Sequence, residues 1–185
     1  MIDLFADGDL VATRTHTQYE ISAGGRRVAS TRNRPVAASH WRSYILRLLG
    51  SRNATRRIEI DVLDASDVPR WQIVLEPGDP NTFAAEVTLV DGTPVGRASA
   101  DGGLINPFPK IELTDPTGAR LGHATSMGAP QVFDADDRLI AEFTWQGAER
   151  PFDKAKWRLA FVDPDVPTEL RALVVAAIIA WELPR

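Results

Sequence analysis

Short segments in which apolar and polar residues alternate run along most of the chain. Clear instances cover residues 57–63, 70–75, 110–113 and 157–161, where the apolar groups fall mostly on one face. Alternation of this kind is typical of β-strands with one buried face. Counting all such segments gives about twelve strands, and no strand–helix–strand rhythm separates them. The pattern therefore predicts an antiparallel sandwich or barrel.

A turn pattern recurs between these segments. A strand leads into a turn rich in Gly or Asp, and the following strand opens with an apolar residue and then a small one. The instances cover residues 5–12, 21–29, 89–96, 113–122 and 133–141. Gly and Asp supply the backbone angles that tight hairpins require. The small residues that close the instances, at positions 12, 29, 96, 122 and 141, indicate sites where a larger side chain would collide with a packed neighbour.

Two segments have helical spacing instead. The first covers 39–50, where apolar residues at 41, 44, 45, 48 and 49 predict an amphipathic helix. Ser39 is a suitable N-cap for it, and Gly50 is a suitable stop. The second covers 167–184, which Thr168 can cap and Pro184 ends.

The second helix is apolar on every face, because residues 172–181 are apolar without interruption. Such a helix is buried either in protein or in a membrane. Its sixteen or so residues reach about 24 Å, less than the ~30 Å of a bilayer core. We therefore expect burial in protein, and we expect a charge at Val175 or Ile178 to unfold the domain.

The large number of strands and the wholly apolar helix explain each other. A closed barrel of about twelve strands is too wide for its own side chains to fill, since eight strands already suffice for that. A central helix would fill the interior and leave no large ligand cavity. The sequence thus predicts a mainly β fold: one domain over residues 1–185, with about twelve antiparallel strands closed around the C-terminal helix.

Composition narrows the setting of the protein. Among 185 residues, 44% are apolar and 25% are charged, as in ordinary globular proteins. The absence of cysteine excludes disulfides and thiolate metal sites and suits a reducing compartment. Acidic residues occupy the N-terminus where a signal peptide needs positive charge. We expect a cytoplasmic protein, with peripheral membrane association as an option, and the net charge of −4 argues against nucleic acid as a partner.

Arginine is the residue type with the most uneven distribution. It far outnumbers lysine, which is typical of a GC-rich bacterial genome. Between Arg14 and Arg57 there are ten arginines and a single acid, Glu20. Guanidinium groups bind phosphate in bidentate fashion, so this segment is a candidate surface for lipid headgroups or other anions. A solvated basic face without a partner is the alternative. The candidate residues are Arg26, Arg27, Arg32, Arg34, Arg42, Arg47, Arg52, Arg56 and Arg57.

Catalytic chemistry leaves little trace in the sequence. His16, His40 and His123 share no motif, and no phosphate loop, nucleophile elbow, zinc-protease or dinucleotide motif is present. We expect a non-enzymatic protein without a cofactor, although distant residues can still assemble a catalytic site. Asp163, Asp165 and Glu169 form a weak candidate calcium site before the last helix. The alternative is a solvated turn whose acids favour the helix N-terminus.

The chain also resembles the Tubby C-terminal-like superfamily, in the branch of the LURP-one-related proteins and phospholipid scramblases. The carriers are residues 19–28 (YEISAGGRRV), residues 57–65 (RIEIDVLDA), the repeated hairpins and the ending at 161–180. The resemblance covers essentially the whole chain. It implies a twelve-stranded antiparallel barrel around a central C-terminal helix.

The function that this resemblance implies is divided. Tubby domains bind phosphoinositide headgroups through basic surface residues, scramblases are associated with calcium and lipid movement, and LURP-one-related proteins have no settled biochemistry. The chain lacks the cysteine-rich segment and the proline-rich N-terminal arm of scramblases, which weakens the inference of scrambling. We expect a module that binds anionic phospholipid reversibly. The alternatives are a structural or protein-interaction domain whose basic face meets an acidic protein partner and, less favoured, scramblase-like lipid handling.

Overall fold

The computed structural model describes residues 4–15, 18–34, 57–76, 82–100, 110–125, 130–145 and 156–182. These residues form one helix, α2 (Thr168–Glu182), and twelve strands. The strands are β1 (Asp9–Thr15), β2 (Gln18–Ala23), β3 (Arg26–Arg34), β4 (Ile58–Asp64), β5 (Pro69–Glu76), β6 (Phe83–Leu89), β7 (Pro94–Ala100), β8 (Ile111–Thr114), β9 (Arg120–Ala124), β10 (Gln131–Asp134), β11 (Leu139–Trp145) and β12 (Lys156–Phe161).

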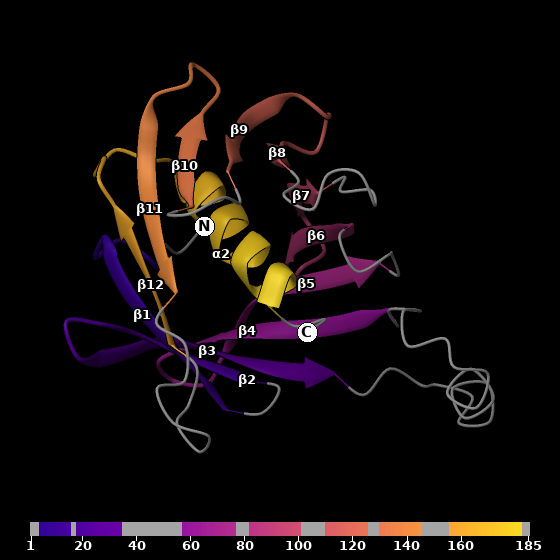
Figure 1. The fold of residues 1–185 in the computed structure, drawn as a ribbon. Coiled ribbons are helices and arrows are strands. Elements are labelled where there is room, and N and C mark those ends of the chain that lie inside the picture. The colour runs from indigo at the N-terminus through magenta and orange to yellow at the C-terminus, as the bar shows by residue number, and fades with distance from the viewer. Residues whose placement is uncertain are drawn as a thin grey trace, which may run out of the picture.

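The strands close into a barrel in which every strand pairs with its sequence neighbours. All pairs are antiparallel, and β12 completes the circle by pairing with β1, where Leu10 lies opposite Leu159. Figure 1 shows the helix α2 running through the space that the strands enclose. The prediction of a mainly β, twelve-stranded antiparallel barrel around the C-terminal helix is therefore confirmed. The predicted helix at 39–50 lies outside the described residues.

The barrel is filled by the helix on one side and by large aromatic side chains on the other. Residues 170–177 of α2 are all buried, as the apolar run from 172 onward requires, and the charged Arg171 is buried with them. Phe5 packs edge-on against Trp71 with ring centroids 5.0 Å apart, and Trp157 contacts both Tyr19 and Phe143. The helix lies against β6, β7 and β8, so these aromatic groups occupy the space that its off-centre position leaves.

The expected crowding at small residues is confirmed at two glycines. A Cβ atom at Gly96 would lie 2.3 Å from the carbonyl oxygen of Thr114 and 3.0 Å from Leu173 on the helix. A Cβ atom at Gly122 would lie 2.3 Å from the carbonyl oxygen of Phe133. Ala12, Ala29 and Ala141 are fully buried. These positions therefore need small residues because strands and helix approach closely there.

The two ends of the barrel differ. At one end, which we call the turn end, lie the tight turns β2–β3, β4–β5, β6–β7, β8–β9 and β10–β11 and the start of α2. At the opposite end lie the strand ends next to residues 16–17, 35–56, 77–81, 101–109, 126–129 and 146–155, which are outside the described part of the chain. Antiparallel alternation produces this division.

One turn geometry occurs three times at the turn end. Asp64, Asp115 and Asp134 each accept two backbone N–H bonds through Oδ1, from the residues two and four positions later, at 2.8–3.0 Å. The residue three positions later has positive φ, namely Asp67 at 61°, Gly118 at 89° and Asp137 at 60°. An Asp side chain that bonds the backbone ahead of it stabilises such a turn locally. The hairpin pattern read from the sequence thus has a structural basis in aspartate as well as glycine.

Candidate functional site

The five candidate arginines within the described residues do not form one surface. Arg26 and Arg27 begin β3 at the turn end, whereas Arg34 ends the same strand at the opposite end. At about 3.3 Å per residue, Arg26 and Arg34 lie roughly 26 Å apart. Arg32, near the end of β3, and Arg57, directly before β4, lie at the same end of the barrel as Arg34. The other four candidates, Arg42, Arg47, Arg52 and Arg56, lie outside the described residues.

At the opposite end the arginines are already matched by acids. Arg34 Nε lies 2.7 Å from Oδ1 of Asp61, and Arg32 lies 3.9 Å from the same carboxylate. Asp61 is only 4% exposed, and its hydrogen bond and charge raise the pKa of Arg34. Arg57 contacts Glu59 at 3.2 Å and Glu76 at 3.3 Å. The acids come from β4 and β5, so the charge imbalance read along the sequence is compensated between strands.

The two arginines at the turn end differ from each other. Arg27 lies 2.9 Å from Asp67 and also donates to the backbone carbonyl of Ala65 at 2.9 Å, so it closes over the β4–β5 turn. Arg26 is exposed and has no ion pair with any residue in the described ranges. A phosphate group would have to displace carboxylates from four of the five described candidates.

The turn end carries a groove that sequence reasoning did not find. It has a volume of about 620 Å³ and lies between the turns β6–β7, β8–β9 and β10–β11 and the first turn of α2. Leu89, Leu121 and Leu170 contribute to its apolar lining. Every residue of this lining belongs to the described part of the chain.

Four carboxylates and one guanidinium line the groove. The carboxylates belong to Asp115, Asp134, Asp136 and Glu169, and the guanidinium belongs to Arg138. Arg138 lies 2.7 Å from Asp134 and 3.9 Å from Asp136. Four negative charges against one positive charge leave an excess of three negative charges. Hydrogen bonds from Thr117 and from the backbone lower the pKa of Asp115, which keeps this carboxylate ionised in neutral solution.

The acids proposed for calcium form a turn. Oδ1 of Asp163 accepts a hydrogen bond from the backbone N–H of Asp165 at 2.8 Å. Glu169 lies in the first turn of α2, where an acid favours the helix N-terminus. Among the described residues, no three acidic or histidine side chains are placed to hold a metal ion. Asp163 and Asp165 thus form the turn that leads into α2, and Glu169 stabilises the N-terminus of this helix.

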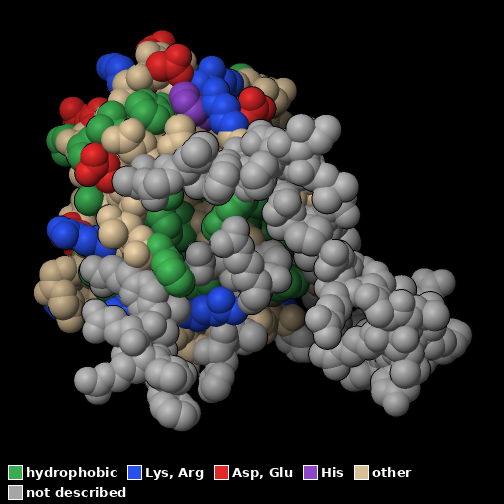
Figure 2. Space-filling model, in the orientation of Figure 1, with side chains coloured by type: hydrophobic (Ala, Val, Ile, Leu, Met, Phe, Trp, Pro, Cys, Tyr) green, Lys and Arg blue, Asp and Glu red, His purple; other side chains and the backbone are tan. Residues whose placement is uncertain are grey.

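His123 is the histidine that the structure places. Its ring stacks on Phe133 with centroids 5.1 Å apart, and its Nδ1 lies 2.6 Å from the Arg120 guanidinium. Burial, together with the charges of Lys110 and Arg120, lowers the pKa of His123, so it is neutral at pH 7. His16 and His40 are outside the described ranges. Figure 2 shows basic, acidic and histidine side chains gathered at the upper edge of one face of the molecule.

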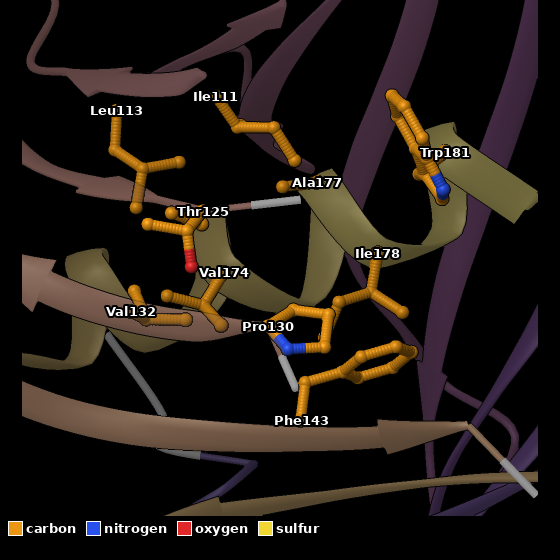
Figure 3. Close-up of a pocket in the computed structure, with 11 residues that line it drawn as sticks. Ile111, Leu113, Thr125, Pro130, Val132, Phe143, Val174, Ala177, Ile178 and Trp181 are labelled. Carbon is orange, nitrogen blue, oxygen red and sulfur yellow. The ribbon is translucent and has the colours of Figure 1, made fainter. Parts of the chain in front are cut away.

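A small apolar cavity lies beside the C-terminal half of α2. Ile178 and Val174 of the helix face Phe143, Val132 and Pro130 across it (Figure 3). The cavity has a volume of about 60 Å³, less than half that of an engineered cavity that accepts benzene, about 150 Å³. The interior thus has no room for a large ligand within the described residues.

Comparison with known proteins gives no relative. No protein-family model, curated protein or solved structure matches the chain. The described helix, α2, is too short to cross a membrane.

Proposed function

We propose that this chain is a non-enzymatic binding domain that associates reversibly with anionic phospholipid surfaces. The observation that carries the proposal is the charge of the segment that joins β3 to β4. From Arg34 to Arg57 there are six arginines and no acidic residue. Each basic residue near an anionic leaflet contributes about 1 kcal/mol. The resemblance to the Tubby superfamily, which implies phosphoinositide binding, supports the same function.

The ion pairs indicate which arginines are available to bind lipid headgroups. Arg32, Arg34 and Arg57 already contact Asp61, Glu59 and Glu76, so they would have to break these pairs to bind phosphate. The affinity is therefore assigned to Arg42, Arg47, Arg52 and Arg56, whose segment contains no acid to compete with the lipid. The paired arginines fix the position where this segment leaves and rejoins the barrel.

Co-sedimentation with liposomes tests the proposal. We expect binding to vesicles that contain phosphatidylserine, no binding to neutral vesicles, and release by salt. The triple variant Arg47→Gln/Arg52→Gln/Arg56→Gln is expected to bind roughly a hundredfold more weakly, from three contributions of about 1 kcal/mol.

A charge-matched control separates local from overall charge. Arg97, Lys110 and Lys156 are exposed on the barrel strands or next to them and have no ion pair with a described residue. Their replacement by Gln changes the net charge equally and is expected to leave binding within about threefold. Absence of binding at low salt, or an equal loss in both triple variants, would contradict the proposal.

A further inference from the structure

The groove at the turn end favours a ligand that combines apolar and cationic groups. Leu89, Leu121 and Leu170 offer apolar surface, and Asp115 and Glu169 lie within the same lining without an ion pair to any described residue. Arginine and lysine place an aliphatic stem on apolar surface and hold a charged head beyond it. A volume of about 620 Å³ accommodates several such side chains.

The chain itself contains a segment with this chemistry. Residues 35–56 carry four arginines and no acid, and Arg42 and Arg47 alternate with Trp41, Ile45 and Leu48. We propose that the groove docks this arginine segment from a second copy of the chain. The excess of three negative charges in the groove meets four positive charges in the segment.

Geometry favours a second copy over the same molecule. The segment leaves the barrel at Arg34 and rejoins it at Arg57, at the end opposite the groove. The acids of the groove lie on the turns β8–β9 and β10–β11, each about five strands from β3–β4 in the ring of twelve. The path to them combines about 23 Å of barrel length with about 24 Å of circumference, roughly 33 Å along the surface. Eleven residues in each direction extend about 36 Å and would leave about one residue to bind the acids.

The proposed contact joins different surfaces of two copies. Such a heterologous contact leaves a free groove on one copy and a free segment on the other, so further copies can add. Because the contact is mainly electrostatic and lies on the surface, it is expected to weaken with salt. The protein then forms larger assemblies as its concentration rises, instead of a closed dimer.

Analytical ultracentrifugation of the full chain tests this self-association. At 20 mM NaCl the average mass is expected to rise with concentration above the 20.3 kDa of one chain, and at 500 mM NaCl it is expected to return to that value. Asp136→Asn/Glu169→Gln in the groove, or Arg42→Gln/Arg47→Gln in the segment, is expected to weaken association at least tenfold. Glu86→Gln/Glu142→Gln on the exposed barrel wall is the matched control and retains association.

Mixing the two defective variants provides a decisive outcome. The groove variant retains its segment and the segment variant retains its groove, so the mixture is expected to form a complex of one copy of each and nothing larger. A single monomeric mass up to 300 µM at 20 mM NaCl overturns the proposal. Equal association of the groove variant and its control also overturns it.

A synthetic peptide of residues 35–56 gives an independent measurement. It is expected to bind the segment variant, whose groove is vacant, and to bind the groove variant at least tenfold more weakly. Equal binding to both overturns the proposal. The inference goes beyond lipid association and is separable from it, because the groove variant keeps every arginine and should sediment with anionic vesicles as the unaltered chain does.

Discussion

At the scale of single residues, Arg171 holds the entrance of the barrel together. It is only 3% exposed, and its guanidinium donates to the carbonyl oxygens of Phe5, Pro164 and Val166 at 2.7, 2.6 and 3.0 Å. It also lies over the Phe161 ring, 5.1 Å from the centroid. One side chain thus joins the N-terminal turn, the linker after β12 and the helix.

Replacing Arg171 is therefore expected to destabilise the fold. Arg171→Met keeps much of the volume but removes the guanidinium hydrogen bonds to three carbonyl groups, and the expected loss is about 3 kcal/mol in the free energy of unfolding. Arg171→Lys keeps the charge but loses the planar fork, so an intermediate loss is expected. Urea unfolding measures both. A change below about 0.5 kcal/mol in Arg171→Met would show that these hydrogen bonds contribute little.

At the scale of elements, the helix α2 shows that burial differs between neighbouring residues of one apolar run. The sequence predicts the same outcome for a charge at Val175 and at Ile178. Val175 is fully buried, whereas Ile178 is partly exposed and lines the small cavity. We therefore expect a charge at Val175 to destabilise the fold more than a charge at Ile178.

Val175→Asp is expected to abolish cooperative unfolding, because an unpaired buried charge costs several kcal/mol against a total stability of about 5–15 kcal/mol. Ile178→Asp is expected to remain folded with a lower unfolding midpoint, since Ile178 is partly exposed and a carboxylate there can turn toward solvent. Thermal unfolding followed by circular dichroism compares the two variants. Equal loss in both would place Ile178 in the fully buried core.

At the scale of elements, the strands and the central helix could be predicted from the sequence, whereas the ion pairs and the groove could not. Alternation and hairpin chemistry predicted the strands, and the uninterrupted run at 172–181 predicted the central helix, because both signals are local. The pairing of Arg32 and Arg34 with Asp61 was missed, since it depends on strand register across 27 residues or more of sequence. The groove was missed for the same reason: its residues come from three hairpins and a helix.

At the scale of the whole molecule, charge is distributed along the barrel axis. The turn end carries the groove with its excess of three negative charges, and the opposite end anchors the arginine segment. Lipid association and self-association, as proposed above, use the same segment. Anionic vesicles should therefore dissociate the assemblies if both hold, and the two readouts can be followed in one titration.

The stability of the molecule should fall with acid in two stages. Burial lowers the pKa of His123 below its ordinary 6.5, so the unfolded chain takes up this proton first and stability declines as the pH falls through about 6.5. Hydrogen bonds lower the pKa of Asp9, Asp64, Asp91, Asp115 and Asp134 below 3.8. Their contribution is present above that value and is lost as the pH falls through the folded pKa values.

Two variants test which residues cause the two stages. The free energy of unfolding of each variant is measured with urea between pH 8 and pH 3. His123→Gln cannot take up the proton, so the decline near pH 6.5 should shrink while the decline near pH 4 remains. Asp134→Asn keeps an oxygen for the turn but loses its charge toward Arg138, so it should reduce only the second stage. A decline near pH 6.5 that persists unchanged in His123→Gln would assign that stage to other groups, because the stacked, arginine-bound ring would then titrate equally in the folded and unfolded chains.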